Sequence, residues 1–399
     1  MTRQSLTLIS FDDGIYAEGA SLDAESSGLR SSRGADWFVQ HERLSGGLSD
    51  GVDVIWLNND RLELAILPTR GMGVWKGDCD GISLGWNSPV RRPVHPAFVD
   101  QNRRGGIGWL DGFNELICRC GLGWSGAPGT DTVRDDDGRV VSEQFLPLHG
   151  RIANLPAHDV RCDVDDDGVI SVTGIVEEAS VFGGRLQLTS TLSTQIGSSM
   201  FRVRDTVRNL SAQPAEVELL YHCNLGPPFL GAGAVFNMAA EEMAPRDDRA
   251  AEDVNDWSVY GAPQTDYAEQ VYFLKPLADA DGRALAILSA AKLTEAFAVR
   301  FDVSSLPWFA LWKNTQSEAD GYVTGLEPAT SFPCNRSFER QNGRVITLAP
   351  GEEIDFELDF EIAENKAAVS RLLDECHAMQ TSKMVTHSKP KSGWSPAGV

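Results

Sequence analysis

The feature that most constrains the fold of this chain is a long series of strand-like segments. In each of them, apolar and polar residues alternate or β-branched residues are enriched, a pattern that predicts strands with one buried face. The segments are residues 52–57, 62–67, 169–176, 186–196, 201–207, 217–221, 271–274, 284–288, 296–301, 309–312, 345–348 and 354–360. The sequence therefore predicts an all-β chain in which many strands form a large sandwich.

One segment near the end of the chain has a helical period instead. Its apolar residues recur every three or four positions, at Ala368, Leu372, Cys376 and Met379. This spacing places them on one face of a helix. We therefore expect a C-terminal helix within residues 363–380 that packs on the sandwich.

The two ends of the chain are less regular. Residues 1–50 contain one strand candidate, residues 6–11, followed by a passage rich in Ser and Gly. Residues 381–399 are polar and contain Pro, Ser and Gly, a composition that favours a flexible tail. We therefore expect residues 1–362 to form the sandwich, its first fifty residues being a strand-and-loop region, and residues 381–399 to add nothing to it.

Composition excludes several classes of partner. The formal net charge of −22 over 399 residues disfavours binding to nucleic acid or to an anionic membrane surface. No apolar run is long enough to span a membrane, and the N-terminus lacks the basic and apolar regions of a signal peptide. The seven cysteines have no spacing typical of a disulfide framework. Together these observations predict a cytoplasmic protein.

Residues 87–130 form a long stretch with little regular periodicity, rich in Gly, Pro, Trp and Asn. Its aromatic content argues against disorder and favours the rim of a cleft. Within it, Gly121-x-Gly123-x-x-Gly126 has the spacing of a dinucleotide-binding loop, but Pro128 stands where the required helix would begin. We therefore expect no nucleotide site here.

Three short segments carry candidates for chemistry. Glu327 precedes Pro328 in Gly-Leu-Glu-Pro, and the proline favours an extended backbone at Glu327 and predicts that a strand ends there. His149 lies in Pro-Leu-His-Gly, and His222 lies in Tyr-His-Cys-Asn-Leu. Taken singly, each residue could be a structural hydrogen-bonding group, and together they could bind zinc. No pair of histidines at ligand spacing supports zinc, so we expect no metal.

In their order along the chain, His149, His222 and Glu327, the three segments resemble the sugar site of the aldose 1-epimerases, or galactose mutarotases. Residues 67–72 and 312–314 resemble more closely an uncharacterised branch of that superfamily, and the resemblance covers residues 50–362. It implies a β-supersandwich with a sugar-binding cleft on its concave face. It also implies roles for Glu327 as general base and His222 as general acid.

The resemblance further implies a set of sugar-binding residues. His149, Arg70 and Asn224 would bind hydroxyl groups, Glu269 or Asp266 would supply a further carboxylate, and Trp109 or Trp312 would stack on the sugar ring. Interconversion of anomers requires one base and one acid near neutral pH, without cofactor or metal. The expected activity is therefore that of an aldose 1-epimerase acting on a monosaccharide.

Two other functions stay open from the sequence. The first is a non-catalytic carbohydrate-binding or sugar-sensing protein of the same fold, since a fold does not determine a function. The second is a lyase or hydrolase of acidic sugars that would use Arg70, Arg151 or Arg336 to bind a carboxylate. The sequence leaves open which sugar is bound and whether the chain forms a homodimer.

Overall fold

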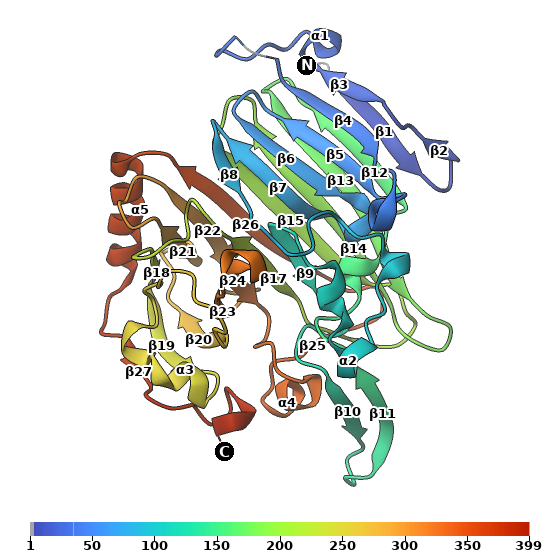
Figure 1. Ribbon diagram of the computed structural model, residues 1–399. Coiled ribbons are helices and arrows are strands. Elements are labelled where there is room, and N and C mark those ends of the chain that lie inside the picture. Colours follow the sequence, from blue (N-terminus) through green and yellow to red (C-terminus); the bar gives the residue numbers. More distant parts are fainter. Residues whose placement is uncertain (1–3, 35, 399) are drawn as a thin grey trace.

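The computed structural model describes residues 4–34 and 36–398. Within these residues, most strands belong to two large sheets, one of ten strands and one of thirteen, in which all pairings but that of β27 with β19 are antiparallel, and two small sheets have two strands each. Figure 1 shows the large sheets curving around each other, with few helices at their edges. The predicted all-β supersandwich with a C-terminal helix is confirmed.

The ten-stranded sheet contains the segments with the clearest alternation. In Val169–Ala179 and Arg185–Gln195, every second residue is buried, because one face covers the core and the other faces outward. In sheet order the strands are β18 (Val235–Met238), β21 (Arg283–Ser289), β22 (Ala296–Asp302), β26 (Glu353–Ala363), β15 (Met200–Asn209), β14 (Arg185–Gln195), β13 (Val169–Ala179), β12 (Asp159–Val164), β1 (Gln4–Ser10) and β2 (Ile15–Tyr16).

The thirteen-stranded sheet positions the candidate site. In sheet order its strands are β27 (Val385–Thr386), β19 (Ala240–Pro245), β20 (Gln270–Pro276), β23 (Trp308–Thr315), β24 (Tyr322–Ala329), β17 (Leu220–Leu225), β9 (Ile117–Cys120), β7 (Gly73–Cys79), β6 (Leu62–Leu67), β5 (Asp53–Asn58), β4 (Phe38–Arg43) and β3 (Ser21–Asp23), and β8 (Ile82–Leu84) pairs with β7. The two-stranded sheets are β10 (Gly129–Arg134) with β11 (Val140–Leu146), and β16 (Ala215–Val217) with β25 (Ile346–Leu348).

A single apolar cluster fills the space between the two large sheets. It joins buried residues of the ten-stranded sheet, such as Val172 and Phe356, to buried residues of the thirteen-stranded sheet, such as Tyr221 and Leu326. Strands β17 and β24 are buried on both faces, so a second layer must cover their outer face. That layer is formed by the Trp-rich segment after β8.

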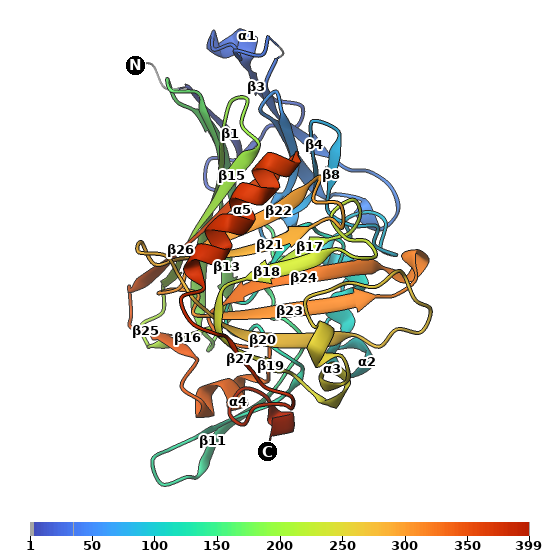
Figure 2. The same cartoon turned by 90° about the vertical axis from the view of Figure 1, so that its left-hand side faces the viewer.

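Helix α5 (Lys366–Met379) lies where the sequence predicts a helix. Asn365 caps its N-terminus by accepting a hydrogen bond from the backbone N–H of Ala368, at 3.0 Å. The buried face of the helix, which includes Leu372 and Cys376, packs on the outer side of β21 and β22. Figure 2 shows α5 lying across this end of the ten-stranded sheet. The shorter helices are α1 (Ala24–Ser27), α2 (Arg103–Gly106), α3 (Asp248–Glu252) and α4 (Arg336–Gln341).

The expectation that residues 381–399 form a flexible tail is wrong for the described part of that segment. Strand β27 pairs in parallel with β19, and His387 Nε2 lies 2.8 Å from the carboxylate of Glu242, which Lys391 also contacts. Trp394 is buried in a cluster with Trp308 and Phe332. The average composition of the tail is polar, but the contacts of Trp394, His387 and Lys391 hold it on the sheet.

None of the helices in the described residues is both long and apolar enough to cross a membrane.

The docking of the tail leads to a first prediction. Trp394→Ala removes a side chain that is 6% exposed, and we expect the free energy of unfolding to fall by about 2–4 kcal/mol. Val385→Ala, in the same tail but at a side chain that is 52% exposed, should change it by less than about 0.5 kcal/mol. Chemical denaturation measures both. Equal, small effects of the two substitutions would mean that the tail is not docked in solution.

Candidate active site

A cavity of about 300 Å³ lies on the outer face of the thirteen-stranded sheet. Its floor comes from β17, β20, β23 and β24, and its walls come from the covering loops. Six of the predicted site residues line it: Trp109, His149, His222, Glu269, Trp312 and Glu327. The lining residues, from Ile107 to Pro333, span more than 200 positions of the sequence, and the fold brings them together at one cavity.

The centre of the cavity is the pair formed by His222 and Glu327. Strands β17 and β24 are antiparallel, and Cys223 lies opposite Leu326. Because adjacent residues alternate between faces, this register sends Cys223 and Leu326 into the core and brings His222 and Glu327 together on the outer face. The Nε2 atom of His222 lies 3.2 Å from Oε1 of Glu327, and both side chains are almost completely buried.

Gly325 provides the space that this pair occupies. A Cβ atom at position 325 would lie 2.5 Å from Oε1 of Glu327 and 3.0 Å from Cε1 of His222. Residue 325 is on the same strand face as residue 327, so any side chain there would displace the carboxylate. The glycine of the Gly-Leu-Glu-Pro segment is thus explained by close packing.

The expected end of the strand at Glu327 is wrong. Strand β24 continues through Pro328 to Ala329, and Pro328 lies opposite Phe309 of β23. A proline removes one backbone donor, and here the ladder is lost only on the β17 side, while the pairing with β23 continues through Pro328 and keeps the strand in the sheet. Glu327 is paired with Ala310 of β23, whereas the pairing of β24 with β17 is interrupted at Glu327 and Pro328 and resumes at Ala329.

Asn224 orients His222. Its side-chain N–H groups donate to the backbone carbonyls of Glu115 and His222, so its Oδ1 is the acceptor for Nδ1–H of His222, at 2.5 Å. The Nε2 atom of the neutral imidazole then carries a lone pair and lies 3.2 Å from Oε1 of Glu327, an oxygen without a hydrogen-bond partner among the described residues. Asn224 is fully buried and does not line the cavity, so the expectation that it binds substrate directly is not met.

His149 is fixed by the glycine-rich segment that resembles a nucleotide loop. Its backbone, with φ of 60°, is held by hydrogen bonds to Gly126 O and from Gly121 N, and its Nδ1–H donates to the carbonyl of Ser125 at 2.7 Å. The backbone N–H of Ser125 donates in turn to the buried carboxyl of Glu218. This leaves Nε2 of His149 as the ring nitrogen available to a ligand.

A second carboxylate lies at the rim of the cavity. Glu269 accepts hydrogen bonds from Nε1 of Trp312, at 2.7 Å, and forms an ion pair with Arg246, at 3.0 Å. Asp266, the alternative, is exposed and does not line the cavity. Arg246 also lines the cavity, but no sequence pattern marks it as a site residue, because it follows β19 in a run of charged residues.

Arg70 is not at the cavity. Its guanidinium is completely buried, where Nε donates to Glu115 at 2.6 Å and Nη1 donates to Val94 O and Asn154 Oδ1. The expectation that Arg70 binds substrate is wrong, because these partners hold its side chain in the interior, beneath the loop that covers the sheet. There it anchors the loop instead of contacting a ligand.

Burial favours the uncharged forms of the central groups. Desolvation raises the pKa of Glu327 well above its ordinary value, and the nearby charge of Glu269 raises it further. Burial, together with the neighbouring His149, lowers the pKa of His222 to about 3, and burial lowers the pKa of His149 to about 4. The raised pKa of Glu327 and the lowered pKa of His222 both favour the state in which the carboxyl is protonated and the imidazole is neutral, so that the pair carries one proton that both groups could hold.

Within the described residues, no group of three or more His, Cys, Asp or Glu side chains has an arrangement that could bind a metal ion.

Comparison with known proteins identifies the family. Residues 49–362 match a family described as a domain of unknown function, DUF4432. The chain belongs to this family. The predicted membership in an uncharacterised branch of the aldose 1-epimerase superfamily is confirmed. No curated protein matches the chain significantly.

Solved structures place the DUF4432 chain in the mutarotase-like fold. A proposed aldose 1-epimerase from Klebsiella pneumoniae is 30% identical, with a TM-score of 0.91 over 98% of this chain and 100% of that one. A galactose mutarotase-like protein from Clostridium acetobutylicum is 17% identical, with a TM-score of 0.57 over 82% and 98%. A proposed aldose 1-epimerase from Escherichia coli K12 is 14% identical, with a TM-score of 0.54 over 79% and 100%. The last two share only the fold.

The hydrogen bonds around His222 generate a second prediction. In NMR spectra of side-chain ¹⁵N, neutral His222 should carry its proton on Nδ1 and should gain no second proton between pH 8 and about pH 4, because its pKa is lowered to about 3. Asn224→Ala removes the acceptor of Nδ1–H and should shift the tautomer balance toward Nε2–H. His377, an exposed histidine on α5, serves as an internal control. A charged His222 at pH 7 would contradict this prediction.

Proposed function

We propose that this DUF4432 protein interconverts the α and β anomers of a monosaccharide. The observation that carries the proposal is the buried contact of 3.2 Å between Nε2 of His222 and Oε1 of Glu327. An acid and a base that share one proton can exchange it with two oxygen atoms of one small substrate. The cavity volume of about 300 Å³ is at the small end for ligand sites, which suits a single sugar ring.

The reaction would proceed by opening and closing of the ring. Glu327 accepts the proton of the C1 hydroxyl, the bond between C1 and the ring oxygen breaks as the C1 carbonyl forms, and Nε2–H of His222 protonates the ring oxygen. Rotation about C1–C2 presents the other face of the aldehyde, and the reverse transfers close the ring. The pair ends with the one proton with which it began.

Substrate binding must first move the shared proton from Glu327 to His222. A C1 hydroxyl that donates to the carboxylate stabilises its ionised form and lowers its pKa. The proton then has only the 3.2 Å contact to cross. His149, through Nε2, and Glu269, held by Arg246 and Trp312, would bind the remaining hydroxyls, while the aromatic walls contact the apolar face of the ring. Asn224 would act through His222 as a positioning residue.

The third prediction tests the base and the acid. Glu327→Gln keeps the shape of the side chain but cannot accept the proton, so turnover should fall by about 10²-fold or more, with a much smaller change in sugar affinity. His222→Asn should do the same, whereas His149→Asn should also weaken binding. Rates are measured by polarimetry or proton NMR exchange over a panel of aldoses, and affinities by calorimetry.

One control variant and two contrary outcomes separate the alternatives. Glu143→Gln, at an exposed site on the β10–β11 hairpin, should leave the rate unchanged. If Glu327→Gln retains wild-type turnover and Glu269→Gln does not, the base is Glu269. If the native protein binds aldoses but interconverts none of them, it is the non-catalytic sugar-binding protein of the same fold.

The fourth prediction concerns the space at Gly325. Gly325→Ala should displace Glu327 and reduce turnover about 10²-fold, because small errors in the placement of catalytic groups are costly. Far-ultraviolet circular dichroism should show that the fold is kept. Gly261→Ala is the matched control, since a Cβ atom there meets nothing within 4 Å. Full activity of the Gly325→Ala variant would show that the contact between positions 325 and 327 does not constrain the base.

A further inference from the structure

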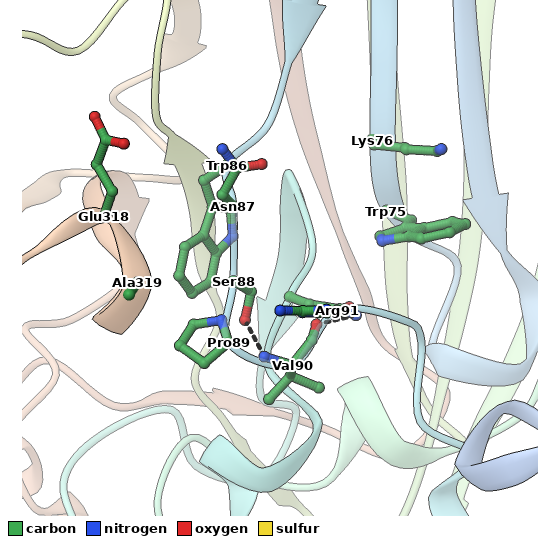
Figure 3. Close-up of a pocket in the computed structure, with 11 residues that line it drawn as sticks. Trp75, Lys76, Trp86, Asn87, Ser88, Pro89, Val90, Arg91, Glu318 and Ala319 are labelled. Atoms are coloured by element: carbon green, nitrogen blue, oxygen red, sulfur yellow. Dashed lines mark hydrogen bonds between the residues drawn. The ribbon is translucent and has the colours of Figure 1, made fainter.

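A second and larger cavity, of about 570 Å³, lies next to the first. It is formed by β7, the segment after β8 and the 3-10 helix η7 (Glu318–Asp320). Figure 3 shows Trp75 and Lys76 on one side and Trp86 on the other, with Glu318 further out. The two cavities share a wall, because Phe113 of the first cavity packs on Trp86 of the second, with ring centroids 5.2 Å apart.

Two cations at this cavity lack carboxylate partners. Lys76 and Arg91 are exposed, and neither forms an ion pair with any described residue. The ammonium group of Lys76 instead lies 4.5 Å from the ring centre of Trp75, which holds it above the indole. The lining also includes the exposed carboxylate of Glu318, so its three charged groups carry a net charge of +1 in a chain with a net charge of −22, and this local excess of positive charge favours an anion.

The other lining groups suit the rest of a saccharide. Trp75 and Trp86 are both partly exposed, and the ring of Trp86 is fixed by its Nε1–H, which donates to Glu115 O. Indole rings offer broad apolar faces on which the C–H face of a sugar can stack. Asn114 also lines the cavity, and its buried Oδ1 has no hydrogen-bond partner within the described residues. Because Asn114 is 3% exposed, this oxygen lies behind the surface of the cavity, and the contacts open to a ligand are those of the indoles and the charged groups.

We propose that this second cavity binds an anionic saccharide, a sugar that carries a carboxylate or a phosphate. Its anionic group would lie between Lys76 and Arg91, and its ring would stack on an indole face. The inference depends only on contacts of the second cavity and does not require that the first cavity catalyses anomer interconversion.

The test is calorimetric titration of the full-length protein with D-glucuronate, glucose 6-phosphate, glucose and inorganic phosphate. At least one of the two anionic sugars should bind at least tenfold more tightly than glucose or inorganic phosphate, and its affinity should fall as salt is raised. The two anionic sugars distinguish a carboxylate from a phosphate as the preferred group. Equal affinity for the anionic sugars and for glucose, or for inorganic phosphate, overturns the proposal.

Substitutions locate the site. Arg91→Gln and Lys76→Gln should each weaken binding of the anionic sugar about tenfold or more, the effect of losing one charge-assisted hydrogen bond. Arg92→Gln is the matched control, because Arg92 is an adjacent exposed arginine that does not line the cavity. An equal loss with Arg92→Gln, or a loss with Arg246→Gln but not with Arg91→Gln, overturns the assignment to the second cavity.

Discussion

The pairing of β17 with β24 is the constraint on which the candidate site depends. The two strands are separated by about a hundred residues, yet their register sets which residues reach the outer face. A slip of one residue would send His222 or Glu327 into the apolar core and expose its neighbours instead. The register is held by core residues on one face of each strand, and the site groups stand on the other face. The stability of the sandwich and the geometry of the site are therefore consequences of the same pairing.

Much of the fold can be predicted from the sequence, because its strands and its long helix show regular spacing of apolar residues over short segments. Alternation identified the long strands of the ten-stranded sheet, and helical spacing identified α5. The docking of the tail could not be predicted, because its residues contact parts of the chain that are distant in sequence. Trp394 packs on Trp308 and Phe332, and His387 and Lys391 contact Glu242, so these partners lie about 60 to 150 residues before the tail. Composition averages over such single contacts and cannot reveal them.

The candidate site was predictable in part, and the misses have a common cause. The resemblance of short segments identified six of the residues that line the cavity, including His149 and Glu327, but it carried no information about the direction of side chains. Arg70 follows a strand as expected, yet Glu115 draws it into the interior. Arg246 is at the cavity because β19 ends beside it, a fact that only the sheet order reveals. Residues with catalytic side chains can thus be identified from short sequence segments, whereas the residues that contact and orient them are known only from the three-dimensional structure.

The docked tail also has a practical consequence for work with this protein. The hydroxyl of Ser395 donates to the backbone carbonyl of Arg246, and Trp394 packs on Phe332, the residue before Pro333 of the first cavity. The end of the chain is therefore attached to the wall of the candidate site. The strand β1 lies at the opposite end of the molecule (Figure 1). A purification tag or fluorescent fusion belongs on the N-terminal side, where it would stay clear of both cavities.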